Sequence, residues 1–248
     1  MNIFFLLLTL IFQITCWAAQ ISPQFVIIIP SYNNEQWCIK NIKSCTQQQY
    51  PNWHLYYIND ASTDKTGDLI ASYIKKNNLQ DRCTLIHNLE RKGALQNIYN
   101  TIHILDPKKV VVLVDGDDFL KSPTVLNKVA KAYKKDQAWM TYGNYIDWPN
   151  RNPGWCELFP SEVFKTNSFR RYKWVASHLR TFYAGLFQKI KKSDLQYKGK
   201  FYSVAWDLCM MFPMLEMSGS EHVVFIKELL YMYNRSNPIS DFRIQRKL

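Results

Sequence analysis

Short apolar runs that alternate with amphipathic stretches constrain the fold of this chain more than any other feature. Phe25–Pro30 and Val110–Val114 contain no polar side chain, which is typical of strands covered on both faces. Trp53–Asp60 and Cys83–His87 are predicted as two further strands. Because helical segments separate them, the pattern predicts βαβ units in a mostly parallel sheet flanked by helices.

Three segments between the predicted strands carry apolar residues at helical spacing. They are Glu35–Gln48, Asp64–Lys76 and Ala94–Leu105. The chain has 248 residues, of which 47% are hydrophobic, so a full core can form. We therefore expect one α/β domain over residues 21–248, after a separate N-terminal leader.

The first 20 residues form this leader. Ile3 to Phe12 is apolar except for one threonine, and the small residues Ala18 and Ala19 follow, as in a secretory signal peptide. The first basic residue, however, is Lys40, so the positive charge that usually precedes such a run is missing. We expect a cleaved signal peptide and a place in the secretory pathway or cell envelope. An uncleaved membrane anchor is the alternative, because the run to Ala19 reaches the length of a minimal span.

Positive charge is concentrated in one segment. The formal net charge is +11, and Lys165–Lys200 contains ten basic residues against one acid. Such a segment forms either a solvated lysine-rich face or a surface for an anionic partner, such as a membrane or a phosphorylated substrate. The sequence contains no nucleic-acid-binding motif, so no nucleic acid is expected as a partner.

Aspartates gather where the predicted strands end. Asp60 closes the second strand, and Asp115, Asp117 and Asp118 follow the fourth. In a parallel sheet these ends share one edge, where ligands bind. Asp60, Asp115 and Asp117 should then approach one another, and carboxylates that lie close need a cation. Their hard oxygens suit Mg²⁺ or Mn²⁺. The alternative is a solvated turn, since Asp-Gly is common in turns.

A phosphatase that forms an aspartyl-phosphate would also use a D-x-D motif, with Asp115 as nucleophile. That chemistry expects the motif after the first strand, with threonine or valine two residues later. Here the motif follows the fourth strand, and Asp118 and Phe119 come after Asp117. The sequence argues against this activity.

Three motifs together resemble the nucleotide-binding half of the inverting family 2 glycosyltransferases of GT-A fold. In order they are "VIIIPSYNNEQWCIKNIKSCTQQQYPNWHLYYINDASTDKT", "ERKG" and "VVVLVDGDDFL", and the likeness extends from about Phe25 to Asn237. It implies a nucleotide-diphospho-sugar transferase-like α/β fold, with residues 21–120 as the nucleotide-binding half and 121–248 as the acceptor-side half. It also implies transfer of a sugar from a nucleotide-diphosphate donor to a glycan, lipid or protein acceptor.

The same resemblance assigns roles to the residues at the strand ends. In the family the acid after the second strand contacts the base, the first D-x-D aspartate reaches the ribose, and the last ligates the metal. A divalent cation, Mn²⁺ or Mg²⁺, is therefore expected at Asp117 and Asp115. The donor-binding residues are expected to be Pro30, Tyr32, Asn33, Glu35, Asp60, Lys92, Asp115, His178 and Arg180. The chain has Gln96-Asn97 where the family often has an arginine-asparagine pair, which leaves Arg91 and Lys92 as the nearest cations.

Inversion at the sugar requires a base that accepts the proton of the acceptor hydroxyl. Asp207 is the candidate, because it opens an apolar helix whose start would face the site. The commoner Glu-Asp pair of the family would align the base with Ala205, whereas the variant with a single aspartate fits better. The alternative role for Asp207 is a first-turn acid that stabilises the helix dipole. Glu216 and His178 are the next candidates for the base.

Two classes of function follow. One is an active glycosyltransferase, and the other is a non-catalytic sugar-nucleotide or polyanion-binding module of the same fold. Both aspartates of the D-x-D motif, Asp115 and Asp117, are present, which favours the enzyme.

Overall fold

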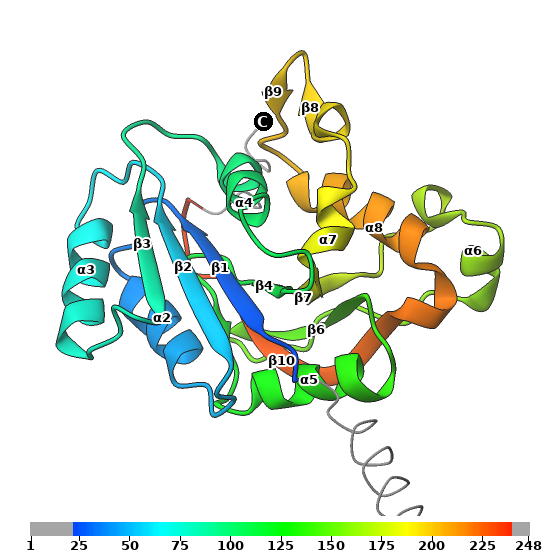
Figure 1. Cartoon of the computed structure of the whole chain (residues 1–248), viewed down its shortest axis with the longest axis horizontal. Coiled ribbons are helices and arrows are strands. Elements are labelled where there is room, and N and C mark those ends of the chain that lie inside the picture. The colour runs from blue at the N-terminus through cyan, green and yellow to red at the C-terminus, as the bar shows by residue number, and fades with distance from the viewer. Residues whose placement is uncertain (1–21, 240–248) are drawn as a thin grey trace, which may run out of the picture.

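The computed structural model describes residues 22–239, so the predicted signal peptide or anchor lies outside the described residues. Within residues 22–239, no helix combines the length and the apolar character needed to cross a membrane. The described chain is built around one eight-stranded sheet with the order β3-β2-β1-β4-β7-β6-β10-β5 (Figure 1).

The elements alternate along the first half of the chain and become less regular afterwards. The strands are β1 (Phe25–Ser31), β2 (Trp53–Asn59), β3 (Cys83–His87), β4 (Val110–Leu113), β5 (Phe119–Leu120), β6 (Met140–Trp148), β7 (Ser177–Tyr183), β8 (Gln196–Tyr197), β9 (Lys200–Phe201) and β10 (Val223–Asn234). The helices are α2 (Cys38–Thr46), α3 (Thr66–Lys76), α4 (Ala94–Ile102), α5 (Val125–Lys135), α6 (Ser161–Lys165), α7 (Ala184–Gln188) and α8 (Trp206–His222), with short 3₁₀ helices η1 (Phe169–Arg171) and η2 (Lys192–Leu195).

The four strands predicted from the apolar runs are confirmed, and β3, β2, β1 and β4 pair in parallel. The three predicted helices are also present, with shifted ends. α2 begins at Cys38 rather than Glu35, because Glu35 is bonded to the next loop through its side chain and its N–H. α4 ends at Ile102 rather than Leu105.

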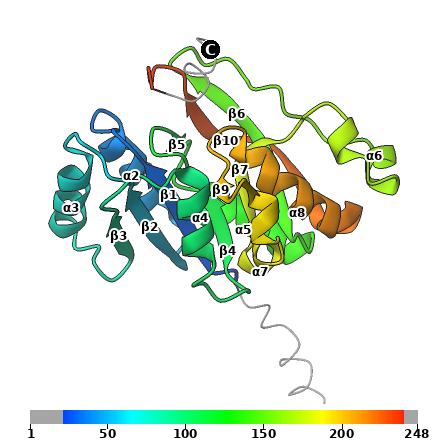
Figure 2. The ribbon, with the colours of Figure 1, turned by 90° about the horizontal axis from the view of Figure 1, so that it is seen from above.

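Both faces of the sheet are covered by helices, which explains why β1 is apolar at almost every position (Figure 2). Phe25, Ile27 and Ile29 pack with residues of α2, α3 and α5 on one face. Val26 and Ile28 pack with residues of α4, α7 and α8 on the other. Alternate side chains of a strand point to opposite faces, and each fully buried side chain of this size contributes about 1.5–3 kcal/mol. The result is a three-layer domain in which β1 and β4 are central.

Two strands from the second half of the chain, β7 and β10, lie beside β4 and the residues that follow it. β7 lies antiparallel to β4 and β6. β10 pairs in parallel with β6 and carries two register shifts, between Ile226 and Leu229 and between Leu229 and Tyr231. Its last residues pair with β5 and lie against the aspartates that follow β4. The site is therefore assembled from segments more than a hundred residues apart.

Candidate active site

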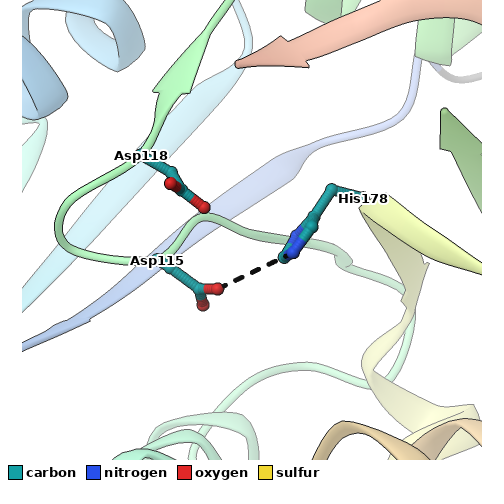
Figure 3. A group of neighbouring side chains, drawn as sticks. All are labelled: Asp115, Asp118 and His178. Carbon is teal, nitrogen blue, oxygen red and sulfur yellow. Dashed lines mark ion pairs between the residues drawn. The ribbon is translucent and has the colours of Figure 1, made fainter. Parts of the chain in front are cut away.

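The antiparallel register of β4 and β7 brings His178 beside Asp115. Leu113 is paired with Arg180, and continuing this register two residues further places Asp115 opposite His178. The Nε2 atom of His178 is 3.9 Å from the Oδ2 atom of Asp115, and Figure 3 shows the two side chains facing each other. Two residues further along β7, the side chain of Arg180 contacts Asp207 at the start of α8.

Asp118 completes a cluster with these two residues. One potential metal-ligand atom from each of Asp115, Asp118 and His178 lies within 4.8 Å of the others. Asp118 is only 1% exposed, and its Oδ1 accepts a hydrogen bond from the N–H of Asn234 at 2.6 Å. Its Oδ2 is buried and makes no hydrogen bond of normal geometry among the described residues, although the Tyr231 hydroxyl is close enough to act on its pKa. A buried oxygen without a hydrogen bond is costly, and a bound ion is one way to satisfy it.

The charge states of the cluster follow from burial. Burial, and then the charges of Asp117 and Asp115, raise the pKa of Asp118 well above its ordinary value. Burial, followed by the positive charges of Arg180 and Arg235, lowers the pKa of His178 well below its ordinary value. The imidazole is therefore neutral, which is the form that binds a metal. It is held in place by stacking on Tyr231, with ring centroids 4.3 Å apart.

This donor set fits a hard divalent cation. Two carboxylates and a neutral imidazole suit Mn²⁺ or Mg²⁺. Cation binding would displace the proton that the raised pKa favours on Asp118. Asp117, which is predicted as a metal ligand, lies beside the cluster, where its Oδ2 accepts a hydrogen bond from the side-chain amide of Asn237 at 2.7 Å. The sequence-based prediction did not include Asp118 or His178 among the metal ligands.

Asp60 does not join the other aspartates, contrary to the sequence-based expectation. Its carboxylate accepts hydrogen bonds from the side chain of Asn88 and from the backbone N–H groups of Lys92 and Gly93, at 2.7–2.9 Å. Burial acts to raise the pKa of Asp60, but the nearby side-chain amide of Asn97 and the hydrogen bonds from Lys92, Asn88 and Gly93 outweigh it and lower the pKa. Asp60 is therefore a fixed anion that shapes the loop before α4.

Two adjoining cavities open at this edge of the sheet. One, of about 450 Å³, contains Asp60 in its wall, and the other, of about 180 Å³, contains Asp115 and Asp117. Both are lined by Pro30, Tyr32, Arg91, Ala94 and Trp206. The first is also lined by Ser31, Lys92, Gly93, Ser203 and Val204; the second is also lined by Asn34, Gly116, Tyr233, Asn237 and Ile239.

A cation–π contact gives the shared wall a flat surface. The guanidinium of Arg91 lies 3.9 Å from the centroid of the Tyr32 ring. A planar heterocycle or a phosphate can be placed against such a pair, because arginine offers both stacking and fixed donors. Sequence reasoning noted Arg91 only as a nearby cation.

Asn33 and Glu35 are predicted to line the donor pocket, but neither lies in the wall of either cavity. The Oδ1 of Asn33 accepts a hydrogen bond from the N–H of Thr63, and the carboxylate of Glu35 accepts one from the N–H of Lys65. Both side chains therefore tie the loop after β1 to the loop before α3. Of the residues predicted around the base, Pro30, Tyr32 and Asp60 line the cavity, together with Lys92.

Asp207 is held by Arg180. The Nη2 of Arg180 donates a hydrogen bond to the Oδ2 of Asp207 at 2.8 Å, and the Asp207 side chain is 26% exposed while that of Arg180 is 5% exposed. Asp207 belongs to the first turn of α8 and follows Trp206, which lines both cavities. His178 and Arg180 themselves are buried and line neither cavity. Their contacts are with Asp115 and Asp207 instead.

Trp206 and Asn237 were missed by sequence reasoning. Trp206 lies next to Asp207, and Asn237 is at the limit of the recognised likeness, so only proximity to these features could have indicated them. The structure adds the contact of Asn237 with Asp117 and a second, at 3.4 Å, with the side-chain oxygen of Asn34.

Residues 26–194 match the model of the family described as "Glycosyl transferase family 2". The chain belongs to this family. The match confirms the resemblance carried by the three motifs, and it spans more than half of the chain.

One relative of this family 2 chain is the Escherichia coli protein "UDP-Glc:alpha-D-GlcNAc-diphosphoundecaprenol beta-1,3-glucosyltransferase WfgD", 29% identical over 48% of this chain and 44% of WfgD. The chain spans less than half the length of the curated relatives it matches.

Two solved structures share the fold. Staphylococcus aureus TarS residues 1–349 in complex with UDP-GlcNAc aligns with a TM-score of 0.63 and 14% identity, over 86% of this chain and 59% of TarS. The mannosyltransferase PcManGT from Pyrobaculum calidifontis, in complex with GDP-Man and Mn²⁺, aligns with a TM-score of 0.61 and 15% identity, over 91% of this chain and 63% of PcManGT. The predicted GT-A fold is confirmed.

Proposed function

We propose that this family 2 chain transfers a sugar from a nucleotide-diphosphate sugar to an acceptor hydroxyl, with inversion at the anomeric carbon. The observation that carries the proposal is the pair of adjoining cavities, one beside the fixed anion Asp60 and the other beside Asp115 and Asp117. Such a donor carries a nucleobase at one end and a diphosphate next to the sugar at the other, so a nucleobase site that adjoins a diphosphate site matches it. The family match favours this enzyme over a non-catalytic binding module.

The donor is proposed to lie with its base in the cavity lined by Asp60 and its diphosphate toward Asp115. The Tyr32–Arg91 pair, common to both cavities, supports the middle of the molecule. UDP-GlcNAc and GDP-Man are the donors in the related structures, so uridine and guanosine donors are the first to test. In this arrangement residues 21–120 provide most of the nucleotide site. Trp206, which belongs to residues 121–248, forms part of its wall.

Asp115, Asp118 and His178 are proposed to hold a divalent cation, with Asp117 beside them. When bound, such a cation would neutralise the charge that develops on the departing diphosphate. The cluster supports this role because Asp118 has a buried oxygen that makes no hydrogen bond of normal geometry and His178 is neutral. Asn237 keeps Asp117 directed along the wall of the same cavity.

Asp207 is proposed as the general base. The acceptor oxygen would form a bond to the anomeric carbon while its proton passes to the Asp207 carboxylate. The bond from the anomeric carbon to the diphosphate would break on the opposite face, and its electron pair would leave with the diphosphate. Arg180 directs the carboxylate through the 2.8 Å hydrogen bond to Oδ2. Glu216 is a weaker candidate, because Arg170 binds both of its oxygens, and His178 is buried.

The experiment is a donor screen. Purified protein is incubated with Mn²⁺ and a panel that includes UDP-GlcNAc, UDP-glucose and GDP-mannose, and release of the nucleoside diphosphate is measured. We expect turnover of one donor class, its loss in a chelator, and its return with Mn²⁺ or Mg²⁺. Full activity in the chelator would exclude the cation. Nucleotide binding without any turnover of the panel, with or without candidate acceptors, would favour the binding module.

A further inference from the structure

The structure divides the basic segment Lys165–Lys200 into two parts. Three basic residues are paired with acids: Arg170 with Glu216, Lys173 with Glu157, and Arg180 with Asp207. In contrast, five lysines in the last twelve residues make no ion pair among the described residues; they are Lys189, Lys191, Lys192, Lys198 and Lys200. The only acid among these twelve residues is Asp194. The uncompensated charge is therefore concentrated around the hairpin formed by β8 and β9.

The backbone of this hairpin places two of the lysines at its turn. Tyr197 is paired with Lys200, and the two residues between them, Lys198 and Gly199, have φ values of 50° and 76°. Positive φ at both central positions is the pattern of a type I′ turn, which suits the twist of a two-stranded hairpin. Lys198 and Lys200 are both exposed at the tip. Figure 1 shows the hairpin standing out beyond α4 and α7.

A third cavity, of about 400 Å³, lies at the hairpin. It is lined by Tyr197, Lys198, Lys200, Phe201, Tyr202, Ser203 and Val204. Tyr197 is 62% exposed and Tyr202 is 36% exposed, so aromatic surface is open to solvent beside the lysine ammonium groups. Neighbouring aromatic and basic side chains that face a hollow are suited to a ligand with both a flat apolar face and a negative charge.

This cavity adjoins the part of the donor site that contains Asp60. Ser203 and Val204 line both this cavity and the one that contains Asp60. The chain then passes directly to Trp206 and Asp207 at the start of α8. A molecule bound at the hairpin can therefore extend along residues 203–206 toward the carboxylate of Asp207.

We propose that this hairpin cavity binds the acceptor, and that the acceptor is an acidic glycan, with a phosphate or carboxylate on the sugar that rests there. That the bound glycan is the acceptor rests on the proposed function, whereas the binding of an acidic glycan at the hairpin does not. Tyr197 and Tyr202 contact the sugar face, and Lys198 and Lys200 bind the anion. A flat lipid surface suits the geometry less well, because the tyrosine and lysine side chains line a concave surface.

The test measures binding by saturation-transfer difference NMR, with glucuronate, glucose 6-phosphate and glucose as probes. The variant is Lys198→Ala/Lys200→Ala, and the matched control is Lys75→Ala/Lys76→Ala, two exposed lysines at the end of α3. We expect the two acidic probes to bind the wild type and the control alike, and to bind the hairpin variant roughly tenfold less. We expect glucose to bind weakly and equally to all three proteins.

Equal binding of the acidic probes to the wild type and the hairpin variant would overturn the proposal, and so would binding of glucose as strong as that of the acids. Tyr197→Ala is a second variant that keeps both lysines, and it should weaken both acidic probes. Sedimentation with vesicles of phosphatidylcholine and phosphatidylglycerol tests the other partner: loss of vesicle binding in the lysine variant, with unchanged sugar signals, would assign the surface to a membrane. UDP binding, measured separately with Mn²⁺, should be unchanged in both variants. Its absence in the wild type would refute the proposed function rather than the hairpin site.

Discussion

The loops that follow β2 and β4 both contain a buried aspartate, but the hydrogen bonding and the pKa of the two carboxyl groups differ. Asp60 is 3% exposed and Asp118 is 1% exposed. Three hydrogen-bond donors satisfy Asp60 and lower its pKa. Asp118 keeps one oxygen without a hydrogen bond of normal geometry, and burial raises its pKa. β2 and β4 are the two neighbours of β1 in the sheet, so topology alone does not set the role of a strand-end acid.

The difference indicates a division of the site. On the β2 side the polar groups are already bonded, so that side offers a rigid, charged wall for binding. On the β4 side, one oxygen of Asp118 makes no hydrogen bond of normal geometry, and Asp207 is partly exposed and held by a single arginine. Groups that accept a proton or a cation must keep unused capacity. We therefore propose that the β2 side binds the donor and that the β4 side carries the chemistry.

The largest effect is expected from Asp207→Asn. The amide has the same shape but does not accept a proton at neutral pH, so transfer should fall by roughly 10² to 10⁴-fold. Donor affinity should hardly change, because the Asp60 side is intact. Transfer rates and calorimetric donor affinities are measured side by side, with Asp194→Asn, an exposed acid of η2, as the control. Near-normal transfer would leave Asp207 as a first-turn acid that stabilises the dipole of α8.

Arg180→Lys should have the next largest effect. Lysine keeps the charge but lacks the planar fork of the guanidinium, so the Asp207 carboxylate would lose its fixed direction. We expect kcat to fall roughly 10- to 100-fold, as for other small misplacements of a reacting group, with KM for the donor unchanged. A rise in KM at constant kcat would instead place Arg180 among the groups that bind the donor.

Asp60→Asn should act on binding rather than on chemistry. One carboxylate oxygen becomes an amide NH₂ group. This group cannot accept the hydrogen bonds that Asn88, Lys92 and Gly93 donate to Asp60. Because a lost hydrogen bond to a charged group costs about 1.5–3 kcal/mol, we expect donor affinity to fall at least about tenfold. Calorimetry with UDP or GDP measures it. If saturating donor does not restore most of kcat, the division between the two sides does not hold.

The same variant predicts a pH dependence of stability. The folded-state pKa of Asp60 is below its ordinary value of 3.8, so its contribution is present above the unfolded-state pKa and is lost as pH falls through the folded-state pKa. At pH 7 the wild type should exceed Asp60→Asn by about 1–3 kcal/mol in the free energy of unfolding. Urea unfolding should show this gap shrink as pH drops below 3.8. A gap that is constant with pH would mean that the charge of Asp60 contributes nothing.

The β2 side was the easier one to predict from the sequence. Its elements are local: an apolar strand, a polar turn and an amphipathic helix follow one another. Asp60 and Lys92 follow β2 and β3, so the parallel pairing of these strands places both residues at one edge, and both line the cavity. Asn33 and Glu35 lie in the same loop cluster, but no sequence pattern distinguishes a side chain that lines the cavity from one that bonds the neighbouring loop.

The β4 side depends on contacts that sequence patterns do not encode. The approach of His178 to Asp115 follows from the antiparallel register of β7, and the bond from Asn234 to Asp118 follows from the register shifts of β10. The Arg180–Asp207 pair joins a strand to a helix 27 residues away. Asp118 looked like a continuation of the D-x-D motif, and only its burial shows that one oxygen lacks a hydrogen bond of normal geometry.

Direct Mn²⁺ binding tests the division of the site most sharply. Electron paramagnetic resonance of free Mn²⁺ gives the affinity of the wild type, Asp118→Asn and Asp60→Asn, each titrated with and without UDP. We predict that Asp60→Asn binds Mn²⁺ like the wild type without UDP, while Asp118→Asn binds it roughly tenfold or more weakly, as expected when a ligand group of a metal site is altered. Equal Mn²⁺ affinity for Asp118→Asn and the wild type, or a loss confined to Asp60→Asn, would contradict the account.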